Sequence, residues 1–432
     1  MELDFYSYDW YLILMKSIIM KDVRHNYWMN LLDGSFFGIA MGFASFTTII
    51  PLFLSTFTGS AILIGLIPAI RNMGYQLPPL FLASAVARQK HYKPMILLNT
   101  IHERIPFLGL ALIAWFSPQL GDQMSLILAF ACIIWQGLGG GITANPLQNL
   151  IARVFPSEIR ATVIGAQSSA NNLMASGSAV VAGLLLISLP APLNYTVCFL
   201  LASLSLAVSY LFLNNLREPE QSDEYIKPSD VSLRDSINNI LLKDTSFRWF
   251  LIAKMLSQFS MMASAFYIIY AVRDYQMGVA TAGIMTSVLF ITQVIANPII
   301  GFVADRWNRK SVLEIGGVTL VLGPLIACLA TGVSLFYPVF ILTGIANAIF
   351  NTLGLAFILE YGTDAERPTY FGLANTLFSP VSVIAPLIGG WLADSAGFKS
   401  TFLFAAFAGV LSIVVLHFFV TDPRRAALLA KA

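Results

Sequence analysis

The chain has 432 residues, of which 57% are hydrophobic and only 11% are charged, and its mean hydropathy is +0.74. Ordinary soluble domains carry about 25% charged residues, which cover their surface. The composition therefore disfavours a soluble enzyme, a disordered chain and a nucleic-acid-binding protein, and it predicts a chain that is mostly transmembrane.

The first 26 residues are expected to form a cytoplasmic N-terminal segment. Glu2, Asp4 and Asp9 stand where a secretory signal has basic residues. The apolar stretch 10–20 is interrupted by Lys16 and is too short to cross a bilayer. We expect an interfacial helix on the cytoplasmic side.

Twelve segments downstream are long and apolar enough to be membrane spans. They predict an all-α membrane protein with twelve transmembrane helices in two pseudo-symmetric six-helix bundles. The expected spans are 27–54, 60–86, 94–116, 124–150, 161–188, 193–214, 247–271, 279–303, 311–331, 337–360, 369–392 and 401–420.

The domain organisation follows from one long polar stretch between the sixth and seventh spans. Residues 215–246 contain eleven charged residues and two prolines, so they are expected to form a cytoplasmic linker, with a short surface helix around Leu233, Ile237 and Leu241. The expected parts are the segment 1–26, a bundle 27–214, the linker 215–246, a bundle 247–420 and a cytoplasmic tail 421–432.

The basic residues predict the orientation of the chain in the membrane. With the N-terminus inside, 20 of the 25 Lys and Arg residues fall on the cytoplasmic side, and only Arg273 and Lys399 fall outside. The other three, Arg71, Arg104 and Lys254, lie within spans. Both termini are therefore expected in the cytoplasm, most naturally of a bacterium whose inner membrane holds the protein.

An internal repeat relates the two bundles. Arg-x-Thr-x-x-Gly follows the fourth span at Arg160 and recurs 207 residues later at Arg367. A six-plus-six repeat is typical of secondary transporters.

A second motif follows the eighth span and carries a family resemblance. Its sequence is Gly301-Phe-Val-Ala-Asp305-Arg306-Trp-Asn-Arg309-Lys310. This resembles the Gly-x-x-x-Asp-Arg-x-Gly-Arg-Lys loop of the major facilitator superfamily, with Asn308 replacing the second glycine. The first-half counterpart departs further, because Ala87 stands where the aspartate belongs. Neither the drug-antiporter nor the sugar-porter signature is met.

The resemblance implies a secondary transporter that works by alternating access as a monomer in the lipid bilayer, without a cofactor. In the family this loop acts as a cytoplasmic gate. We expect Asp305 to cap the start of the eleventh span near Thr369, with Arg306 and Arg309 bracing it. A purely topological role for these basic residues is the alternative. Ala87 makes any such gate one-sided.

Charged side chains within spans are costly, and they mark candidate sites for a substrate or coupling ion. Arg71 lies near the midplane and could hold a carboxylate or phosphate, or else bridge to an acidic side chain. Asp33 and Lys254 occupy matching depths in the two halves, so we expect them to pair across the halves in one state and separate in the other, or else to snorkel to the headgroups. Asp33 could instead carry a proton.

The third span contains His102-Glu103-Arg104. Glu103 is a candidate proton relay, although a structural ion pair is favoured for this span. Pro106 stands where a His-Glu-x-x-His zinc site needs its second histidine. The histidines and the three cysteines are scattered, so we expect no catalytic residue and no metal site.

Several amides lie in the spans and need partners or a wet cavity. Those singled out as substrate or ion candidates are Gln136, Gln258, Asn347 and Asn351. The predicted function is transport of a small organic solute, coupled to H⁺ or Na⁺, with multidrug efflux as the alternative and a transporter-like receptor as a third. The basic residues in the spans favour an anionic or polar solute. No nucleic-acid partner is expected.

Overall fold

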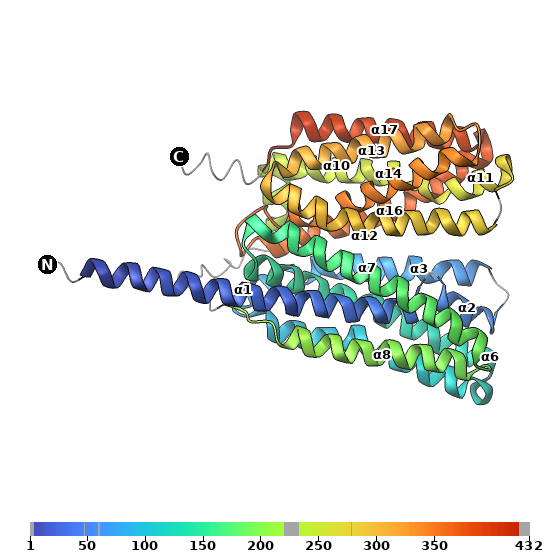
Figure 1. Ribbon diagram of the computed structural model, residues 1–432, viewed down its shortest axis with the longest axis horizontal. Helices are drawn as coiled ribbons and strands as arrows, with labels where there is room; N and C mark the ends of the chain where they lie inside the picture. The colour runs from blue at the N-terminus through green and yellow to red at the C-terminus, as the bar shows by residue number, and fades with distance from the viewer. Residues whose placement is uncertain (1–3, 47, 59–60, 220–232, 278, 423–432) are drawn as a thin grey trace.

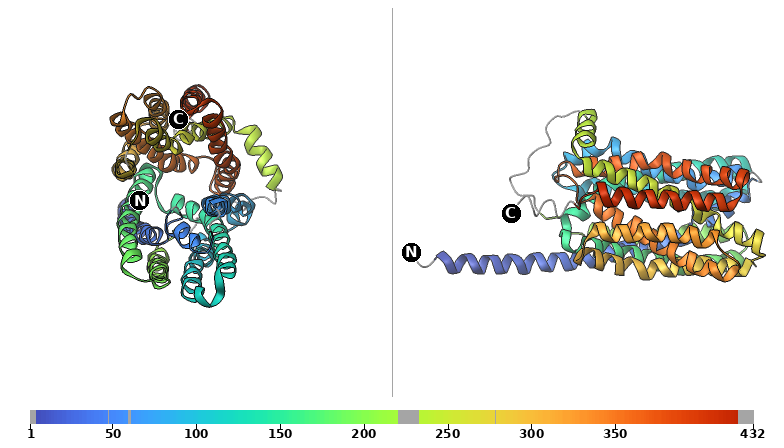
Figure 2. Two further views of the ribbon diagram at one scale, coloured as in Figure 1. Left: turned by 90° about the vertical axis from the view of Figure 1, so that its right-hand side faces the viewer. Right: turned by 90° about the horizontal axis from the view of Figure 1, so that it is seen from above.

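The computed structural model describes residues 4–46, 48–58, 61–219, 233–277 and 279–422. Within these ranges every regular element is helical and there is no strand. Two groups of helices lie side by side with nearly parallel axes, α1–α8 in one group and α10–α17 in the other (Figure 1). The end view in Figure 2 shows the two groups as separate bundles around a central region.

The N-terminal half is built from eight helices. They are α1(Asp4–Phe43), α2(Ile49–Ser55), α3(Ala61–Gln76), α4(Pro78–Phe81), α5(Ala83–Ala87), α6(Tyr92–Val154), α7(Ser157–Ser188) and α8(Leu193–Asn214). Pro78 and Pro79 cannot continue the backbone hydrogen bonds of α3, so the second span is divided into α3, α4 and α5.

The C-terminal half begins after the linker. Its elements are α9(Leu233–Lys243), α10(Thr245–Met261), η1(Met262–Ala265), α11(Tyr267–Tyr275), α12(Val279–Arg306), α13(Arg309–Cys328), η2(Val333–Leu335), α14(Phe336–Ala348), η3(Ile349–Leu353), α15(Gly354–Ile358), α16(Arg367–Ala396) and α17(Phe398–Phe419). The element η3 is a π-helical turn that joins α14 to α15 in the tenth span.

Nine helices among the described residues are long and apolar enough to cross a membrane. One of them, α6, holds two spans: a straight helix of its 63 residues would be about 95 Å long, too long for one crossing, and the chain turns at Gly121, where φ is +73°. The α1 and α3–α5 segments supply two more. The twelve-span, two-bundle architecture expected from the sequence is confirmed.

The N-terminal segment is not separate from the first span. A single helix runs for 40 residues from Asp4 to Phe43, and its first part projects beyond the bundle (Figure 1). The expected boundary at residue 26 therefore falls inside a continuous helix. The helix expected in the linker is α9, while residues 220–232 and the tail 423–432 lie outside the described residues.

The two halves contact each other crosswise. α12 of the second half packs along α7 of the first, and α16 of the second packs on α4 and α5 of the first. Both contacts rely on small residues: a Cβ at Gly165 would collide with the Asn297 carbonyl, and one at Gly372 would meet Leu80. The glycine of each repeated Arg-x-Thr-x-x-Gly motif thus lets two helices from different halves approach closely.

Candidate functional site

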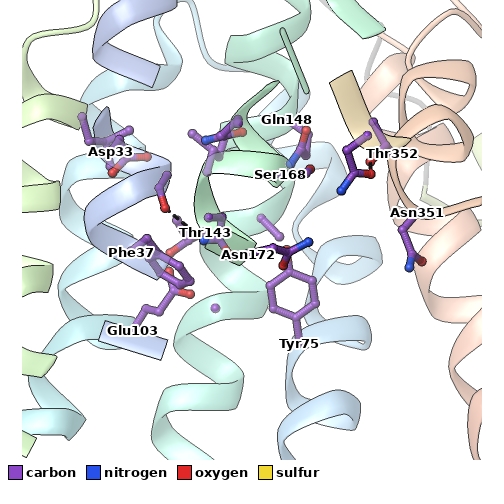
Figure 3. Close-up of a pocket in the computed structure, with 18 of the residues that line it drawn as sticks. Asp33, Phe37, Tyr75, Glu103, Thr143, Gln148, Ser168, Asn172, Asn351 and Thr352 are labelled. Atoms are coloured by element: carbon purple, nitrogen blue, oxygen red, sulfur yellow. Dashed lines mark hydrogen bonds between the residues drawn. The ribbon is translucent and has the colours of Figure 1, made fainter. Parts of the chain in front are cut away.

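A cavity of about 410 Å³ lies between the two halves. Figure 3 shows side chains entering it from both: Asp33, Glu103 and Tyr75 from the first half, and Asn351 and Thr352 from the second. The volume falls within the range of small-molecule sites. All four charged residues of its lining belong to the first half, and they are Asp33, Arg71, Glu103 and Arg104.

Asp33 is held inside its own half. Its carboxylate lies 3.5 Å from the Arg104 guanidinium, and the Ser209 hydroxyl donates a 2.5 Å hydrogen bond to it. Arg104 also donates to the Ser209 hydroxyl at 2.9 Å and to the Leu206 carbonyl at 3.1 Å. These contacts tie α1, α6 and α8 together. In this state Asp33 pairs with a nearer cation on α6 and not with Lys254, so the pairing expected in one state of the transport cycle stays a prediction.

Arg71 lies at the wall of the cavity on α3. Its guanidinium carbon is 4.6 Å from the centre of the Phe46 ring, and its Nε is buried without a hydrogen-bond partner. Glu103 on α6 is near enough to act electrostatically on Arg71. Within the described residues, however, neither side chain forms an ion pair or side-chain hydrogen bond. The cavity thus contains a cation and an anion that attract each other without direct contact.

The second half contributes amides and hydroxyls to the cavity. Asn347 and Asn351 both line it, as do Gln293, Asn297 and Thr352. The Thr352 hydroxyl donates to the Asn297 side chain at 2.8 Å, which fixes α12 against η3. These side chains offer hydrogen bonds but no charge.

Three other candidates lie elsewhere. Lys254, Gln258 and Gln136 are absent from the cavity lining. The Lys254 ammonium lies 5.1 Å from the centre of the Phe378 ring, between α10 and α16, and among the described residues no carboxylate pairs with it. Gln136 is buried, and its side-chain oxygen has no hydrogen-bond partner. The cavity therefore brings together five of the eight substrate or ion candidates.

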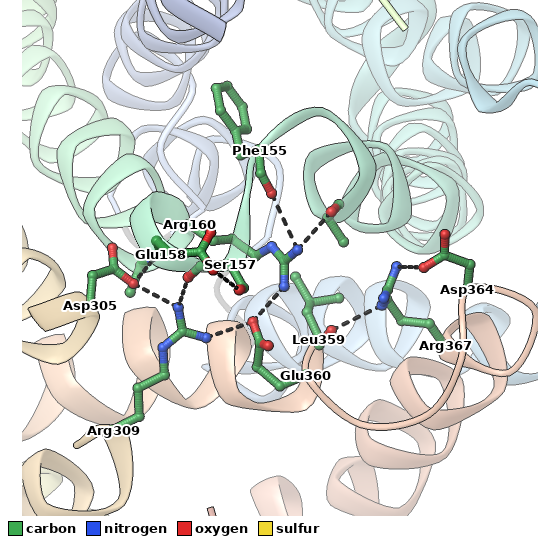
Figure 4. A network of polar contacts seen from close by, with 12 residues as sticks. Phe155, Ser157, Glu158, Arg160, Asp305, Arg309, Leu359, Glu360, Asp364 and Arg367 are labelled. Carbon is green, nitrogen blue, oxygen red and sulfur yellow. Dashed lines mark hydrogen bonds and ion pairs between the residues drawn. The ribbon is translucent and has the colours of Figure 1, made fainter. Parts of the chain in front are cut away.

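The end of the molecule nearest the termini is closed by a polar network between the halves (Figure 4). Asp305, in the last turn of α12, accepts hydrogen bonds from the backbone amides of Ala161 at 3.2 Å and Thr162 at 2.6 Å. These amides lie in the first turns of α7, where the helix dipole favours an anion. The expectation that Asp305 caps the eleventh span near Thr369 is wrong, because the crosswise packing places α12 against α7.

Arg309 extends this network. It is fully buried, pairs with Asp305 at 2.6 Å and with Glu360 at 2.7 Å, and also donates to the Ser157 carbonyl. Arg160 from the first half reaches the same Glu360 oxygen at 2.5 Å. One carboxylate, Glu360, therefore joins a guanidinium from each half.

Two other residues of the loop motif lie outside this network. Arg306 is exposed and stacks on Phe302 at 3.9 Å, so the expectation that it braces Asp305 is wrong. Lys310 donates to the His417 carbonyl at 2.7 Å, which anchors α13 to α17 within the second half. Gly301 packs against the Ala161 backbone, where a Cβ would collide.

At the crosswise counterpart between α16 and α4–α5, a neutral side chain bridges the halves. Asn145 donates to the carbonyls of Pro79 at 2.6 Å and Pro368 at 3.0 Å, which bridges the halves with neutral hydrogen bonds. Arg367 turns back to Asp364 at 2.8 Å, inside its own loop. In these contacts the α7–α12 side is joined through charged groups and the α16 side through the Asn145 amide.

The contact between α7 and α12 continues beyond the polar network. The Ser169 hydroxyl still donates to the Val294 carbonyl at 2.5 Å. Farther along α7, a Cβ at Gly177 or Gly183 would meet no atom within 4 Å. The hydrogen bonds that Ala161, Thr162 and Ser169 make with α12 all lie in the first half of α7.

Sequence reasoning missed Glu360 and Arg160 as parts of the closure. Arg160 is the first residue of the repeated motif, which indicated the repeat but not a contact. Glu360 stands at the predicted end of a span, where a lone carboxylate gives no sign of its partners. The contact between Arg160 and Glu360 depends on the crosswise packing of the halves, which the sequence does not show.

Comparisons with known proteins agree on the architecture. Residues 250–432 match the family model described as Major Facilitator Superfamily. Over 143 residues the chain is 29% identical to "Multidrug resistance protein 2" of Bacillus subtilis (strain 168), a match that covers 33% of this chain and 36% of the relative. Over 149 residues it is 30% identical to "Tetracycline resistance protein, class H" of Pasteurella multocida, covering 34% and 37%. The chain thus matches little more than a third of the length of these curated relatives.

A solved structure extends the likeness to almost the whole chain. The major facilitator transporter FucP, crystallised in the outward conformation, aligns with a TM-score of 0.73 at 18% identity. The alignment covers 91% of this chain and 98% of that one. At this identity the likeness establishes the fold.

Proposed function

We propose that this chain, which belongs to the major facilitator superfamily, is a secondary active transporter that moves a small organic solute by alternating access. The carrying observation is the cavity of about 410 Å³ between the two halves, with four charged side chains on one wall and amides on the other. Binding sites near the midplane, between two repeats that rock against each other, are the general design of such transporters.

The conformation supports the same proposal. The network of Asp305, Arg309, Glu360 and Arg160 joins the halves at the end nearest the termini. With both termini in the cytoplasm, as 20 cytoplasmic basic residues against two external ones favour, this is a state closed to the cytoplasm. We propose a bacterial cytoplasmic membrane as its location and a monomer as its working form.

An ion gradient is the proposed source of energy. Asp33 and Glu103 are buried carboxylates that line the cavity, and such groups in membrane helices serve as proton or sodium sites. We propose coupling to H⁺ or Na⁺, and no resident cofactor. A pH jump and a sodium jump across proteoliposomes, applied separately, would distinguish the two ions.

The relatives named for drug resistance favour a second candidate, efflux of amphiphilic drugs. The cavity lining argues for a polar solute, because only Phe37 and Tyr75 in it are aromatic. Resistance of a drug-sensitive host that expresses the chain, measured with a panel of cationic drugs and tetracycline, would favour efflux if the minimal inhibitory concentrations rise.

The test of transport itself uses the full chain in proteoliposomes. Solutes that stabilise the purified protein in a thermal-shift screen are then offered with an imposed H⁺ or Na⁺ gradient. Accumulation that disappears in Arg71→Gln but persists in Lys399→Gln, an exposed basic residue, supports the proposal. Specific binding without any uptake or exchange would make the chain a receptor and contradict it.

A further inference from the structure

We propose that the cavity selects a zwitterion, a solute that carries an anionic and a cationic group and no net charge, of which an α-amino acid is the simplest kind. Arg71 would hold the anionic group and Glu103 the cationic one. This inference rests on the proposed function, because it names the chemical class of the solute that the transporter carries.

The charges of the lining give the first argument. Of the four charged residues, Asp33 and Arg104 satisfy each other at 3.5 Å and share the Ser209 hydroxyl. That pair connects α1, α6 and α8, and Arg104 also acts electrostatically on Glu103, although within the described residues the two form no ion pair. Arg71 and Glu103 are therefore the two charged groups that remain available to a solute.

The second argument is that one nitrogen of the Arg71 guanidinium has no partner among the described residues. Its Nε is buried and has no hydrogen-bond partner, while the ring of Phe46 covers one side of it at 4.6 Å. An unsatisfied buried donor is costly, and a carboxylate satisfies a guanidinium through two parallel hydrogen bonds. The structure thus leaves space for an anionic group at this position.

Glu103 is placed to receive the opposite charge. It reaches the cavity beside Gly140, where a Cβ would lie 3.2 Å from the carboxylate and 3.0 Å from the Tyr75 ring. A side chain at this position would crowd the carboxylate and the ring. Glu103 and Arg71 interact electrostatically without forming an ion pair within the described residues, so a solute can bridge them.

The net charge of the cavity gives the third argument. Two cations and two anions line it, and the second half adds only neutral groups such as Asn347 and Asn351. A solute with net charge would leave one buried charge without compensation, at a cost of several kcal/mol. A zwitterion compensates the charges of both Arg71 and Glu103, and the uncharged part of the solute can accept hydrogen bonds from the amides. Lys254, which would have favoured an anion, lies outside the lining.

The experiment uses the purified full chain in nanodiscs and three matched forms of each probe. Leucine, glutamine and phenylalanine are offered as free zwitterions, as cationic methyl esters and as anionic N-acetyl derivatives, and γ-aminobutyrate and dialanine add zwitterions with larger charge separation. Binding is measured by calorimetry. We expect at least one zwitterion to bind roughly tenfold or more tighter than its ester and its N-acetyl form.

Two variants assign the groups. Arg71→Gln should abolish the preference for the zwitterion over its methyl ester, and Glu103→Gln the preference over its N-acetyl form. Asp122→Asn and Lys399→Gln are exposed controls that should leave both preferences intact. An ester or N-acetyl form that binds best, or a panel in which no zwitterion binds, overturns the inference.

Uptake into proteoliposomes separates this inference from the proposed function. A charged probe that binds and accumulates would overturn the zwitterion inference and leave transport standing. A zwitterion that binds with the expected preferences but never crosses would support the site and contradict transport.

Discussion

Asp305 at the end of α12 accepts a 2.6 Å hydrogen bond from the backbone amide of Thr162 in α7, across the boundary between the two halves. The repeat places Thr369 at the position equivalent to Thr162, and the second motif places Ala87 at the position equivalent to Asp305. Pro368 replaces Ala161 and has no amide hydrogen to donate. The contact between α5 and α16 therefore lacks the carboxylate that would accept the hydrogen bonds and one of the two amides that would donate them.

Replacing Asp305 by asparagine should favour the state open to the cytoplasm. A neutral amide side chain cannot accept both backbone hydrogen bonds and also neutralise Arg309, so the closed state should lose about 1–3 kcal/mol. The readout is labelling of Asn347→Cys by an impermeant thiol reagent from the cytoplasmic side, with Cys132, Cys198 and Cys328 changed to serine. Labelling should accelerate at least several-fold, and transport should fall while membrane insertion persists. Asp394→Asn, on an exposed part of α16, is the matched control.

Glu360 should be coupled to both of its arginines. Glu360→Gln leaves Arg160 and Arg309 buried without their shared carboxylate, and breaking such a pair costs about 3–5 kcal/mol. A double-mutant cycle with Arg160→Gln, read by thermal unfolding in detergent, should give a coupling of about 0.5–3 kcal/mol. Glu366→Gln, whose carboxylate stays within an exposed loop, should change little. Additive effects of the two substitutions would refute the coupling.

Ala87→Asp should fail to create a second gate. The residue is 5% exposed, Pro368 offers no amide, and the Thr369 amide already donates to the Glu366 carbonyl at 2.8 Å. The new carboxylate would therefore be buried without partners and should lower the melting temperature. Ala87→Asp combined with Pro368→Ala should recover part of that loss and slow turnover. If Ala87→Asp alone slows turnover at unchanged stability, this account of the asymmetry is wrong.

Arg104 should matter for the stability of the first half. Arg104→Gln leaves Asp33 with only the Ser209 hydroxyl, so the free energy of unfolding should fall by about 3–5 kcal/mol. The double variant Arg104→Gln/Asp33→Asn removes both charges and should recover much of this loss. Arg273→Gln, an exposed arginine on α11, is the control. The stability of the wild type, the single variant, the double variant and the control is compared by thermal unfolding in detergent.

The fold could be predicted from the sequence because lipid imposes it. Twenty apolar residues in a row leave little choice but a helix, and the distribution of Lys and Arg orders the spans. The repeated Arg-x-Thr-x-x-Gly motif also marked real contact points, at Gly165 and Gly372.

The contacts between spans could not be predicted in the same way. Matching depth suggested Asp33 with Lys254, but depth does not specify which face of each helix meets which neighbour. Arg104 lay next to Glu103 in the sequence, yet its direction toward α8 and Asp33 depends on how α6 is rotated in the bundle. The target of Asp305 was missed for a related reason, because the sequence does not show that the halves pack crosswise.

The π-helical turn η3 lines the cavity through Asn351 and Thr352 and precedes Glu360 of the closure in the chain. Each residue of an α-helix advances by about 100° around the axis, so deleting one residue from Ile349–Leu353 would rotate α15 by that amount relative to α14. Gly344 would stay packed on Thr292 of α12, while Glu360 would turn away from both of its arginines. The extra residue in this turn therefore fixes how α15 is rotated relative to α14. That rotation lets Asn347 face the cavity while Glu360 faces Arg160 and Arg309.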